Sequence, residues 1–175
     1  MSTTIDEAAQ LLLAAWKGAT RINGLPSRCR PADLDQGYAI QDALLLATGE
    51  ALGGHKIAAT SLAGQQHIGI THPITGGLLS SQIRSPGAQV SLSGNQMCAA
   101  EAEFVFEFKA RVSPRSTQYS TVEVLQAVGA LRLGIEISDS RLSGFAGGGT
   151  PIGGGQCVCT CVRSGTGCCQ RLAPE

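Results

Sequence analysis

Three glutamates stand at spacings that place carboxylates side by side on strands. Glu101 and Glu103 alternate with apolar residues in the segment AEAEFVFEF, and Glu136 alternates in the same way in LRLGIEIS. Because successive side chains of a strand point to opposite faces, Glu101 and Glu103 share a face, with Cα atoms roughly 6.5–7 Å apart. Carboxylates at this spacing can converge on one cation, and oxygen-only ligands suit Mg²⁺ or Mn²⁺. The same pattern is also typical of the solvated face of an antiparallel strand, with Arg132 or Arg141 pairing with Glu136.

Other residue types capable of catalysis are scattered along the chain. Lys56 lies in the segment GGHKIAATS, where it is either a solvated strand lysine or a site residue. His55, His67 and His72 do not have metal-ligand spacing and are expected on the surface or in loops. The sequence contains no GxSxG, no P-loop and no GxGxxG that opens a helix. The carboxylates are therefore the strongest candidates for chemistry.

The N-terminal part of the chain predicts helices. Thr4-x-x-Glu7 is a capping box, and apolar residues follow it at helical spacing. A Pro-containing loop precedes Asp33 and Asp35, either of which can cap a second helix that ends at Gly49.

The rest of the chain predicts strands with one inserted helix. GGHKIAATS predicts a short strand, and residues 69–77 predict loops and turns. The alternating segments AEAEFVFEF and LRLGIEIS predict two further strands. Their apolar faces, which include Phe104, Phe106 and Phe108, are expected to point into a core. Ser120-x-x-Glu123 is a capping box that predicts a short helix between those strands. Helices followed by mixed strands indicate an α+β fold.

Composition indicates an ordinary globular domain and excludes several classes of protein. The chain has 175 residues, of which 43% are hydrophobic and 15% are charged, and its formal net charge is +0. The charge balance argues against a nucleic-acid partner, and the absence of a run of about 18 apolar residues argues against a membrane partner. The acidic N-terminal stretch MSTTIDEAAQ is unlike a signal peptide, so we expect a soluble, cytoplasmic protein.

Four segments in order resemble one protein family. They are YAIQDALL, GHKIAATS, AEAEFVFEF and GIEISDSR, with IGITHPITGGLL between the second and the third. Together they are similar to the 2-keto-4-pentenoate hydratase / 2-oxo-enoate decarboxylase group of the fumarylacetoacetate hydrolase superfamily. The resemblance covers about residues 33–141. It implies an α+β fold in which N-terminal helices precede a mixed, strongly bent sheet that the intact family rolls up on itself.

The resemblance also implies roles for individual residues. Glu101, Glu103 and Glu136 match the three glutamates that hold a divalent ion, Mg²⁺ or Mn²⁺, and this match favours the metal site over a solvated face. Lys56 matches the family's catalytic lysine, and Ser61, at the end of the same segment, matches a substrate-binding position. The chain departs from several hydratases after Pro73, where Ile74 replaces an aspartate. The resemblance therefore leaves the proton-transfer group unassigned.

The activity that the resemblance implies is a metal-dependent hydro-lyase reaction in aromatic catabolism. The enzyme would convert the small molecule 2-hydroxypenta-2,4-dienoate to 4-hydroxy-2-oxopentanoate, and the full-length protein would be a homo-oligomer. One alternative is decarboxylation of a 2-oxo-3-enedioate, a 4-oxalocrotonate-type substrate, on the same metal site. Another is an inactive truncated fragment.

The C-terminal segment has a composition unlike the rest of the chain. GGGTPIGGGQCVCTCVRSGTGCCQRLAPE is rich in Gly and Cys but lacks the paired CxxC spacing of a zinc site. Codons for Gln156 to Cys161 can also encode Asn-Ala-Tyr-Ala-Arg-Ala one base later, which is similar to the family's next segment, so a frameshift upstream of Gln156 is the favoured hypothesis. We expect residues 1–50 to form a helical segment, residues 51–145 a partial sheet domain, and residues 146–175 an aberrant, disordered tail. Sheet edges left exposed by this truncation are expected to promote association.

Overall fold

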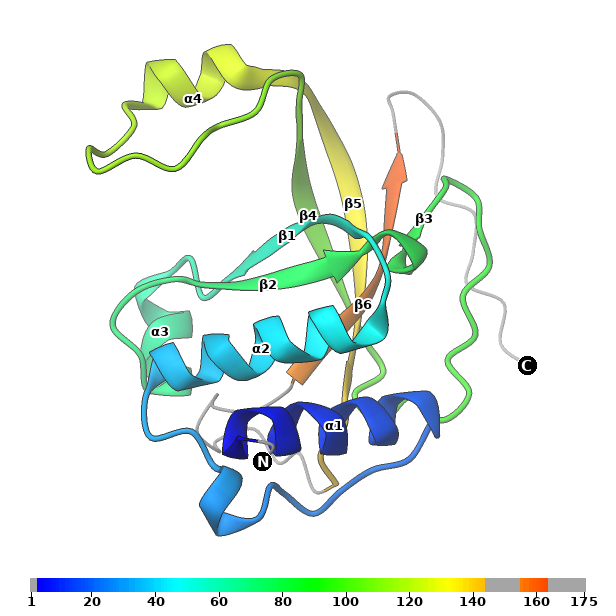
Figure 1. Cartoon of the computed structure of the whole chain (residues 1–175). Coiled ribbons are helices and arrows are strands. Elements are labelled where there is room, and N and C mark those ends of the chain that lie inside the picture. The colour runs from blue at the N-terminus through cyan, green and yellow to red at the C-terminus, as the bar shows by residue number, and fades with distance from the viewer. Residues whose placement is uncertain (1–2, 144–154, 164–175) are drawn as a thin grey trace.

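The N-terminal helix begins at a residue whose side chain satisfies free backbone N–H groups. The computed structural model describes residues 3–143 and the backbone of residues 155–163 (Figure 1). Helix α1 (Thr4–Lys17) is capped by Thr3, whose Oγ1 accepts a hydrogen bond from the Asp6 backbone N–H at 3.1 Å. The capping box is therefore Thr3-x-x-Asp6, one residue before the predicted one. Glu7 instead forms an ion pair with Arg28.

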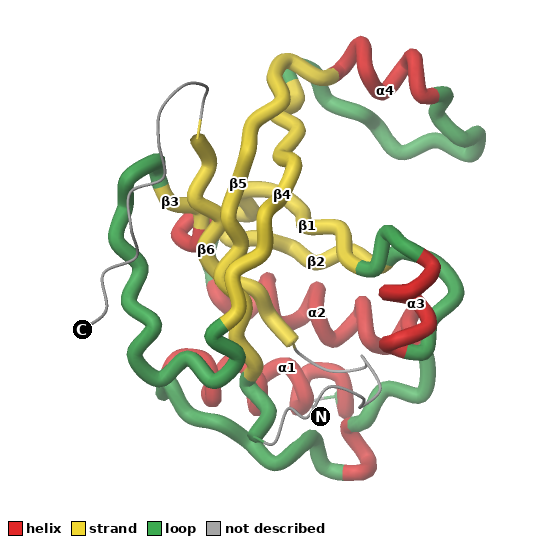
Figure 2. The backbone as a smooth tube through the Cα atoms, turned by 180° about the vertical axis from the view of Figure 1, so that it is seen from behind, coloured by secondary structure: helices red, strands yellow, loops and turns green. Residues whose placement is uncertain are grey.

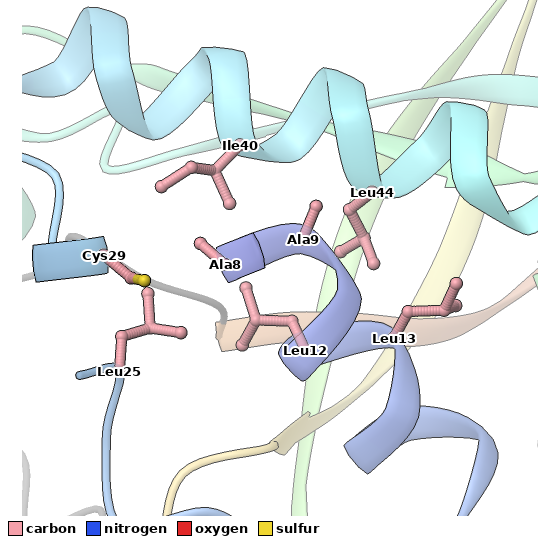
Figure 3. Packing of buried hydrophobic residues seen from close by; sticks show 8 residues of the cluster. All are labelled: Ala8, Ala9, Leu12, Leu13, Leu25, Cys29, Ile40 and Leu44. Carbon is pink, nitrogen blue, oxygen red and sulfur yellow. The ribbon is translucent and has the colours of Figure 1, made fainter. Parts of the chain in front are cut away.

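The second helix forms where the sequence predicts it. Helix α2 (Leu34–Thr48) begins after Asp33, whose side chain accepts from the Gln36 backbone N–H, and ends at Gly49, whose φ of 72° is readily adopted only by glycine. α1, α2 and the short 3₁₀ turn η1 (Ser27–Cys29) enclose a buried apolar core (Figure 3). Its buried members are Ala8, Ala9, Leu12, Leu13, Leu25, Cys29, Ile40 and Leu44.

A two-stranded antiparallel sheet follows the helices. Strand β1 (Leu52–Ala58) pairs with β2 (Ile74–Leu79), and helix α3 (Leu62–Ile68) connects them. The prediction of loops over residues 69–77 is wrong from Ile74 onward, because the glycines there lie in a strand. A Cβ at Gly77 would lie 2.5 Å from Leu45 Cδ1, so glycine lets α2 approach β2 closely.

The remaining strands form a four-stranded mixed sheet. Its order is β3 (Ile83–Arg84), β6 (Gly155–Arg163), β5 (Val128–Ser140) and β4 (Ala99–Phe108). Only the β3–β6 pair is parallel. The 3₁₀ turn η2 (Ser80–Gln82) precedes β3, and the predicted short helix forms as α4 (Thr121–Ala127), capped by Ser120. The mixed helix and strand content agrees with the predicted α+β class.

The C-terminal segment differs from the prediction where it is described. Residues 155–163 form strand β6 beside β5, whereas we predicted a disordered tail over residues 146–175. Residues 144–154 and 164–175 lie outside the described residues, and the division of the chain into three parts stays a prediction.

The elements form layers that bring β1 close to β5. In both views the β1–β2 pair lies between α2 and the β4–β5 pair (Figures 1 and 2). The Gln41 side chain of α2 accepts a hydrogen bond from the Gly77 backbone N–H at 3.0 Å, which ties α2 to β2. The other face of the β1–β2 pair is directed toward the large sheet.

The two faces of the β4–β5 pair are covered in the opposite way to the prediction. Their carboxylate-bearing face is the covered one, with Glu136 and Ser138 buried, whereas Phe104 is 71% exposed and Leu133 is 65% exposed. The expectation that Phe104, Phe106 and Phe108 point into a core is therefore wrong for the described part of the chain. The physical reason is that β1–β2 packs on the polar face, and a strand pattern by itself does not choose which face receives a neighbour.

The core between α1 and α2 gives a matched pair of substitutions on one helix. Leu44 is 2% exposed and Leu46 is 83% exposed. Leu44→Ala should lower the free energy of unfolding by about 2–5 kcal/mol, because it removes buried methyl groups and leaves a cavity. Leu46→Ala should change it by about 0.5 kcal/mol or less. Urea unfolding of both variants measures the difference, and equal effects would contradict this packing of α2.

The exposed aromatic face of β4 predicts self-association. Phe104→Thr with Phe106→Thr keeps residues that favour strands while removing exposed apolar area. We expect the double variant to sediment as smaller species than the parent chain at the same concentration. Val122→Thr, on the exposed surface of α4, is the control. Unchanged association of the double variant would show that this face is not responsible.

Candidate active site

The register of β4 and β5 places the predicted carboxylates on one face. Glu101 lies directly opposite Glu136, and Glu103 lies directly opposite Gly134. Directly opposed residues on antiparallel strands have Cβ atoms about 4.5–5.5 Å apart, so both side chains of the Glu101–Glu136 pair project from the same face. Gly134 has no side chain to compete with Glu103 on this face. The three glutamates therefore lie on one face of the sheet, where Glu136 is buried, Glu103 is half-buried and Glu101 is exposed.

A hydroxyl group joins two of these carboxylates. Ser138 Oγ lies 3.0 Å from Glu101 Oε1 and 3.1 Å from Glu136 Oε1. A hydroxyl has a single proton, so Ser138 donates to one of the two oxygens at a time. Both carboxylates thus direct an oxygen toward the same point. Ser138 was not predicted as a site residue, although its position two residues after Glu136 puts it on the same strand face.

A lysine from the small sheet reaches the cluster. Lys56 of β1 places its Nζ 2.6 Å from Glu136 Oε1, and the Glu136 side chain is almost fully buried. Gly76 lies opposite Lys56 in the β1–β2 register, and a Cβ there would lie 3.1 Å from Lys56 Cγ. The lysine stem thus passes over a glycine on its way to β5. The structure brings Lys56 together with Glu136, and the catalytic role of Lys56 stays a prediction.

Electrostatics within the cluster favour binding of positive charge. Burial raises the pKa of Glu103 above the ordinary value for a glutamate, and the neighbouring carboxylates of Glu136 and Glu101 raise that pKa further, while Lys56 opposes the shift. Negative charges held close together raise each other's pKa because ionisation of one disfavours ionisation of the next. A cation among them would relieve this repulsion.

The donor set fits a hard divalent ion in its chemistry. Three carboxylates and one hydroxyl supply only oxygen atoms, which are the ligands that Mg²⁺ and Mn²⁺ prefer. Among the described residues, no three His, Cys, Asp or Glu side chains already surround one point closely enough to hold a metal ion. Glu136 is instead directed at Lys56 and Ser138.

Other residues considered in the sequence analysis have different contacts. Ser61 caps α3, where its Oγ accepts a hydrogen bond from the Gly64 backbone N–H at 3.1 Å, so a role in binding substrate stays a prediction. Arg132 forms an ion pair with Glu107. The guanidinium of Arg141 lies over the Trp16 ring, 4.5 Å from its centroid.

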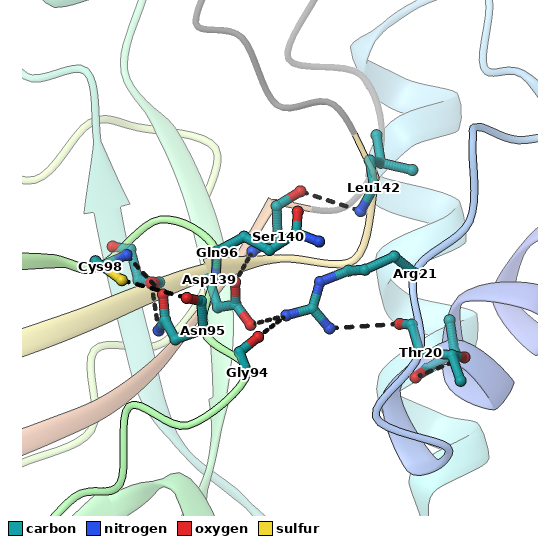
Figure 4. A network of polar contacts seen from close by, with 11 residues as sticks. Thr20, Arg21, Gly94, Asn95, Gln96, Cys98, Asp139, Ser140 and Leu142 are labelled. Atoms are coloured by element: carbon teal, nitrogen blue, oxygen red, sulfur yellow. Dashed lines mark hydrogen bonds and ion pairs between the residues drawn. The ribbon is translucent and has the colours of Figure 1, made fainter. Parts of the chain in front are cut away.

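A polar network next to the cluster fixes the start of β4, and the sequence analysis did not identify it (Figure 4). The Asp139 carboxylate forms an ion pair with Arg21 and accepts a hydrogen bond from the Gln96 backbone N–H at 3.0 Å. The Asn95 side chain donates to the Ser138 carbonyl oxygen at 2.9 Å. These contacts tie the loop before β4 to the end of β5. They thereby hold the two strands in the register that aligns Glu101 with Glu136.

Comparison with known proteins identifies relatives of this chain. It is 31% identical over 143 residues to 2-keto-4-pentenoate hydratase 1 of Dechloromonas aromatica, a match that covers 80% of this chain and 54% of the relative. It is 29% identical to 2-keto-4-pentenoate hydratase 2 of the same organism, covering 95% of this chain and 68% of the relative. It is 26% identical to the TodF product hydratase of Pseudomonas putida, covering 81% of this chain and 53% of the relative.

Solved structures agree with the fold. The 4-oxalocrotonate decarboxylase of Pseudomonas putida G7, complexed with magnesium and adipate, superposes with a TM-score of 0.71 at 21% identity, covering 89% of this chain and 61% of that chain. The same enzyme complexed with calcium and acetate superposes with a TM-score of 0.69. No protein-family model matches the chain. None of the helices in the described part of the chain has the length and apolar character needed to cross a membrane.

The relatives and the fold point to the same group of proteins. The chain spans about half the length of two of the curated hydratases that it matches. Its matches to hydratases extend over most of its own length, and its fold is similar to that of a 4-oxalocrotonate decarboxylase. These relatives agree with the resemblance that the four ordered segments of the sequence indicated.

Proposed function

We propose that this protein is built for metal-dependent hydration of 2-hydroxypenta-2,4-dienoate to 4-hydroxy-2-oxopentanoate. The observation that supports the proposal best is the convergence of Glu101, Glu136 and Ser138 on one face, with Lys56 2.6 Å from Glu136. The curated relatives are named hydratases, which favours hydration among the reactions that this group performs.

The three glutamates would hold Mg²⁺ or Mn²⁺, and structural neighbours complexed with magnesium or calcium support a divalent ion. A bound ion would supply Lewis acidity to the carboxylate and 2-oxo oxygens of the substrate. Glu101, Glu103 and Glu136 would hold that ion from one face of the β4–β5 pair. Because Glu136 is buried, its carboxylate is shielded from water and interacts more strongly with a cation than an exposed one.

Lys56 would act on the substrate from the opposing sheet. Its ammonium group can donate hydrogen bonds to the oxygen on which negative charge develops as the dienol becomes an enolate. Ser61 follows β1 along the chain and would contact the substrate beyond the lysine. Ile74, which replaces an aspartate of several hydratases, has no titratable group. The residue that transfers protons to the substrate is therefore not assigned by this proposal.

Decarboxylation of a 2-oxo-3-enedioate is the second candidate, and one observation favours it. Ile74 removes a carboxylate that several hydratases have, and a decarboxylase does not need to deliver water to the substrate. Product analysis separates the two reactions, because one adds water to the substrate and the other releases CO₂. The purified chain would be incubated with each substrate and Mg²⁺ or Mn²⁺. A second protein, with the reading frame restored upstream of Gln156, would be assayed in parallel.

Turnover of the dienoate by either protein would support the hydratase proposal. Release of CO₂ alone would favour the second candidate. Turnover by the restored protein alone would identify the present chain as an inactive fragment, and no turnover by either would contradict both enzymatic proposals.

Glu103→Gln tests the metal site directly. The variant loses one charged ligand, so Mg²⁺ affinity measured by calorimetry should fall about tenfold or more. Loss of a residue that only hydrogen-bonds to a metal ligand already lowers affinity by about that factor. Glu50→Gln, at the exposed end of α2, makes the same chemical change away from the cluster and should leave affinity unchanged. Equal affinities of the parent chain and Glu103→Gln would remove Glu103 from the ligand set.

Glu103→Gln should weaken Mg²⁺ binding, but the raised pKa of Glu103 predicts that the same variant stabilises the metal-free fold. A carboxyl group whose pKa is higher in the folded than in the unfolded state stabilises the fold when protonated, and this contribution is lost as pH rises through the raised pKa. In chelator at pH 7, Glu103→Gln should therefore raise the melting temperature. Below the ordinary value of 4.5 the difference should shrink, because Glu103 is then protonated in both states. A melting temperature lowered at pH 7 would contradict the prediction.

A further inference from the structure

Lys56 and a divalent ion would need the same oxygen atom. Lys56 Nζ lies 2.6 Å from Glu136 Oε1, which is a hydrogen-bond distance between an ammonium group and a carboxylate. Ser138 Oγ lies 3.1 Å from the same oxygen. Glu136 is 4% exposed, so its carboxylate has few other orientations in which solvent can satisfy it. An ion coordinated through Oε1 would bring a second positive charge against the lysine ammonium.

We propose that Lys56 is an internal cation that exchanges with the divalent ion. While Lys56 pairs with Glu136, it neutralises part of the charge of the carboxylate cluster. When the ion binds the glutamates, Lys56 is displaced from Glu136, and its ammonium becomes available to the substrate oxyanion. This inference rests on the proposed function, because it takes the three glutamates as the ion's ligands. It adds an order of events, in which the ion binds before the lysine can act on substrate.

The structure provides room and direction for this movement. The lysine stem passes over Gly76, where a larger residue would crowd it, and its side chain keeps partial exposure to solvent. A lysine is a flexible point charge that can turn between partners, whereas an arginine would be held by paired hydrogen bonds. Glu101 and Glu103 lie on β4, next to β5, whereas Lys56 belongs to the other sheet. The ion would therefore be held from β4 and β5, and Lys56 would withdraw toward β1.

The first experiment compares Lys56→Met with Lys109→Met, which removes the same charge from an exposed position after β4. In calorimetric titrations, Lys56→Met should bind Mg²⁺ at least about tenfold more tightly than the parent chain does, because the variant lacks the ammonium group that competes for Glu136. A lysine that only positions Glu136 for the ion would have the opposite effect. Equal or weaker binding to Lys56→Met would overturn the exchange.

The second experiment uses the unaltered chain and does not depend on a variant that folds. Lysine amines are acetylated with and without Mg²⁺, and each site is quantified by mass spectrometry. Mg²⁺ should increase the labelling of Lys56 relative to the other lysines, Lys17 and Lys109, because the amine is released from its ion pair. Unchanged or reduced labelling of Lys56 by a concentration of Mg²⁺ that calorimetry shows to saturate the protein would overturn the proposal.

The two measurements also separate this inference from the proposed function. If the parent chain binds Mg²⁺ and Glu103→Gln weakens binding while the Lys56 results are negative, the metal site stands and the exchange fails. If the parent chain binds neither Mg²⁺ nor Mn²⁺, the metal site and the exchange both fail.

Discussion

The buried carboxylate of Glu136 is the constraint around which this structure is arranged. An ionised group removed from water must be paired and hydrogen-bonded, or its burial costs several kcal/mol. Glu136 meets this requirement with an ammonium from β1 and a hydroxyl from its own strand. The small β1–β2 sheet must therefore pack against the polar face of β5. The position of α2, which lies on the other side of that small sheet, follows from the same packing.

This arrangement explains why the sheet faces differ from a simple amphipathic pattern. In many antiparallel sheets the apolar face is covered and the polar face meets water. Here the polar face is covered by the β1–β2 pair, and the apolar face of Phe104 and Leu133 is exposed in the described part of the chain. The curated relatives are longer than this chain. A sheet that is covered on one face and presents apolar residues on the other is suited to further packing.

Two networks outside the cluster hold the site in place. The apolar core between α1 and α2 fixes the position of α2, against which β2 packs. It thereby also fixes the distance between β1, the partner strand of β2, and β5. The ion pair between Arg21 and Asp139 joins the segment after α1 to the end of β5, beside the loop that leads into β4. Neither network contains a residue assigned to catalysis. Both act on the distances between the strands that contain Lys56, Glu101 and Glu136.

Local patterns in the sequence determined much of this protein. Gly49 marked the end of α2 and Ser120 the start of α4, while the start of α2 was narrowed to Asp33 or Asp35, because helix ends need particular side chains or backbone angles. Alternation placed Glu101 and Glu103 on one strand face, and the resemblance of four ordered segments indicated the family. These features depend on residues that are close in the chain.

Only the tertiary structure decided which face of the β4–β5 pair is covered and which partner Glu136 has. The sequence offered Arg132 or Arg141 as partners, whereas the structure places Lys56, 80 residues away in the chain, in contact with Glu136. The tertiary structure also decided that Gly76 and Gly77 lie in a strand. Glycine is favourable at these two positions because the Lys56 stem approaches Gly76 and helix α2 approaches Gly77. Strand pairing and packing join residues that are distant in sequence, and no local pattern specifies which of several possible neighbours will arrive.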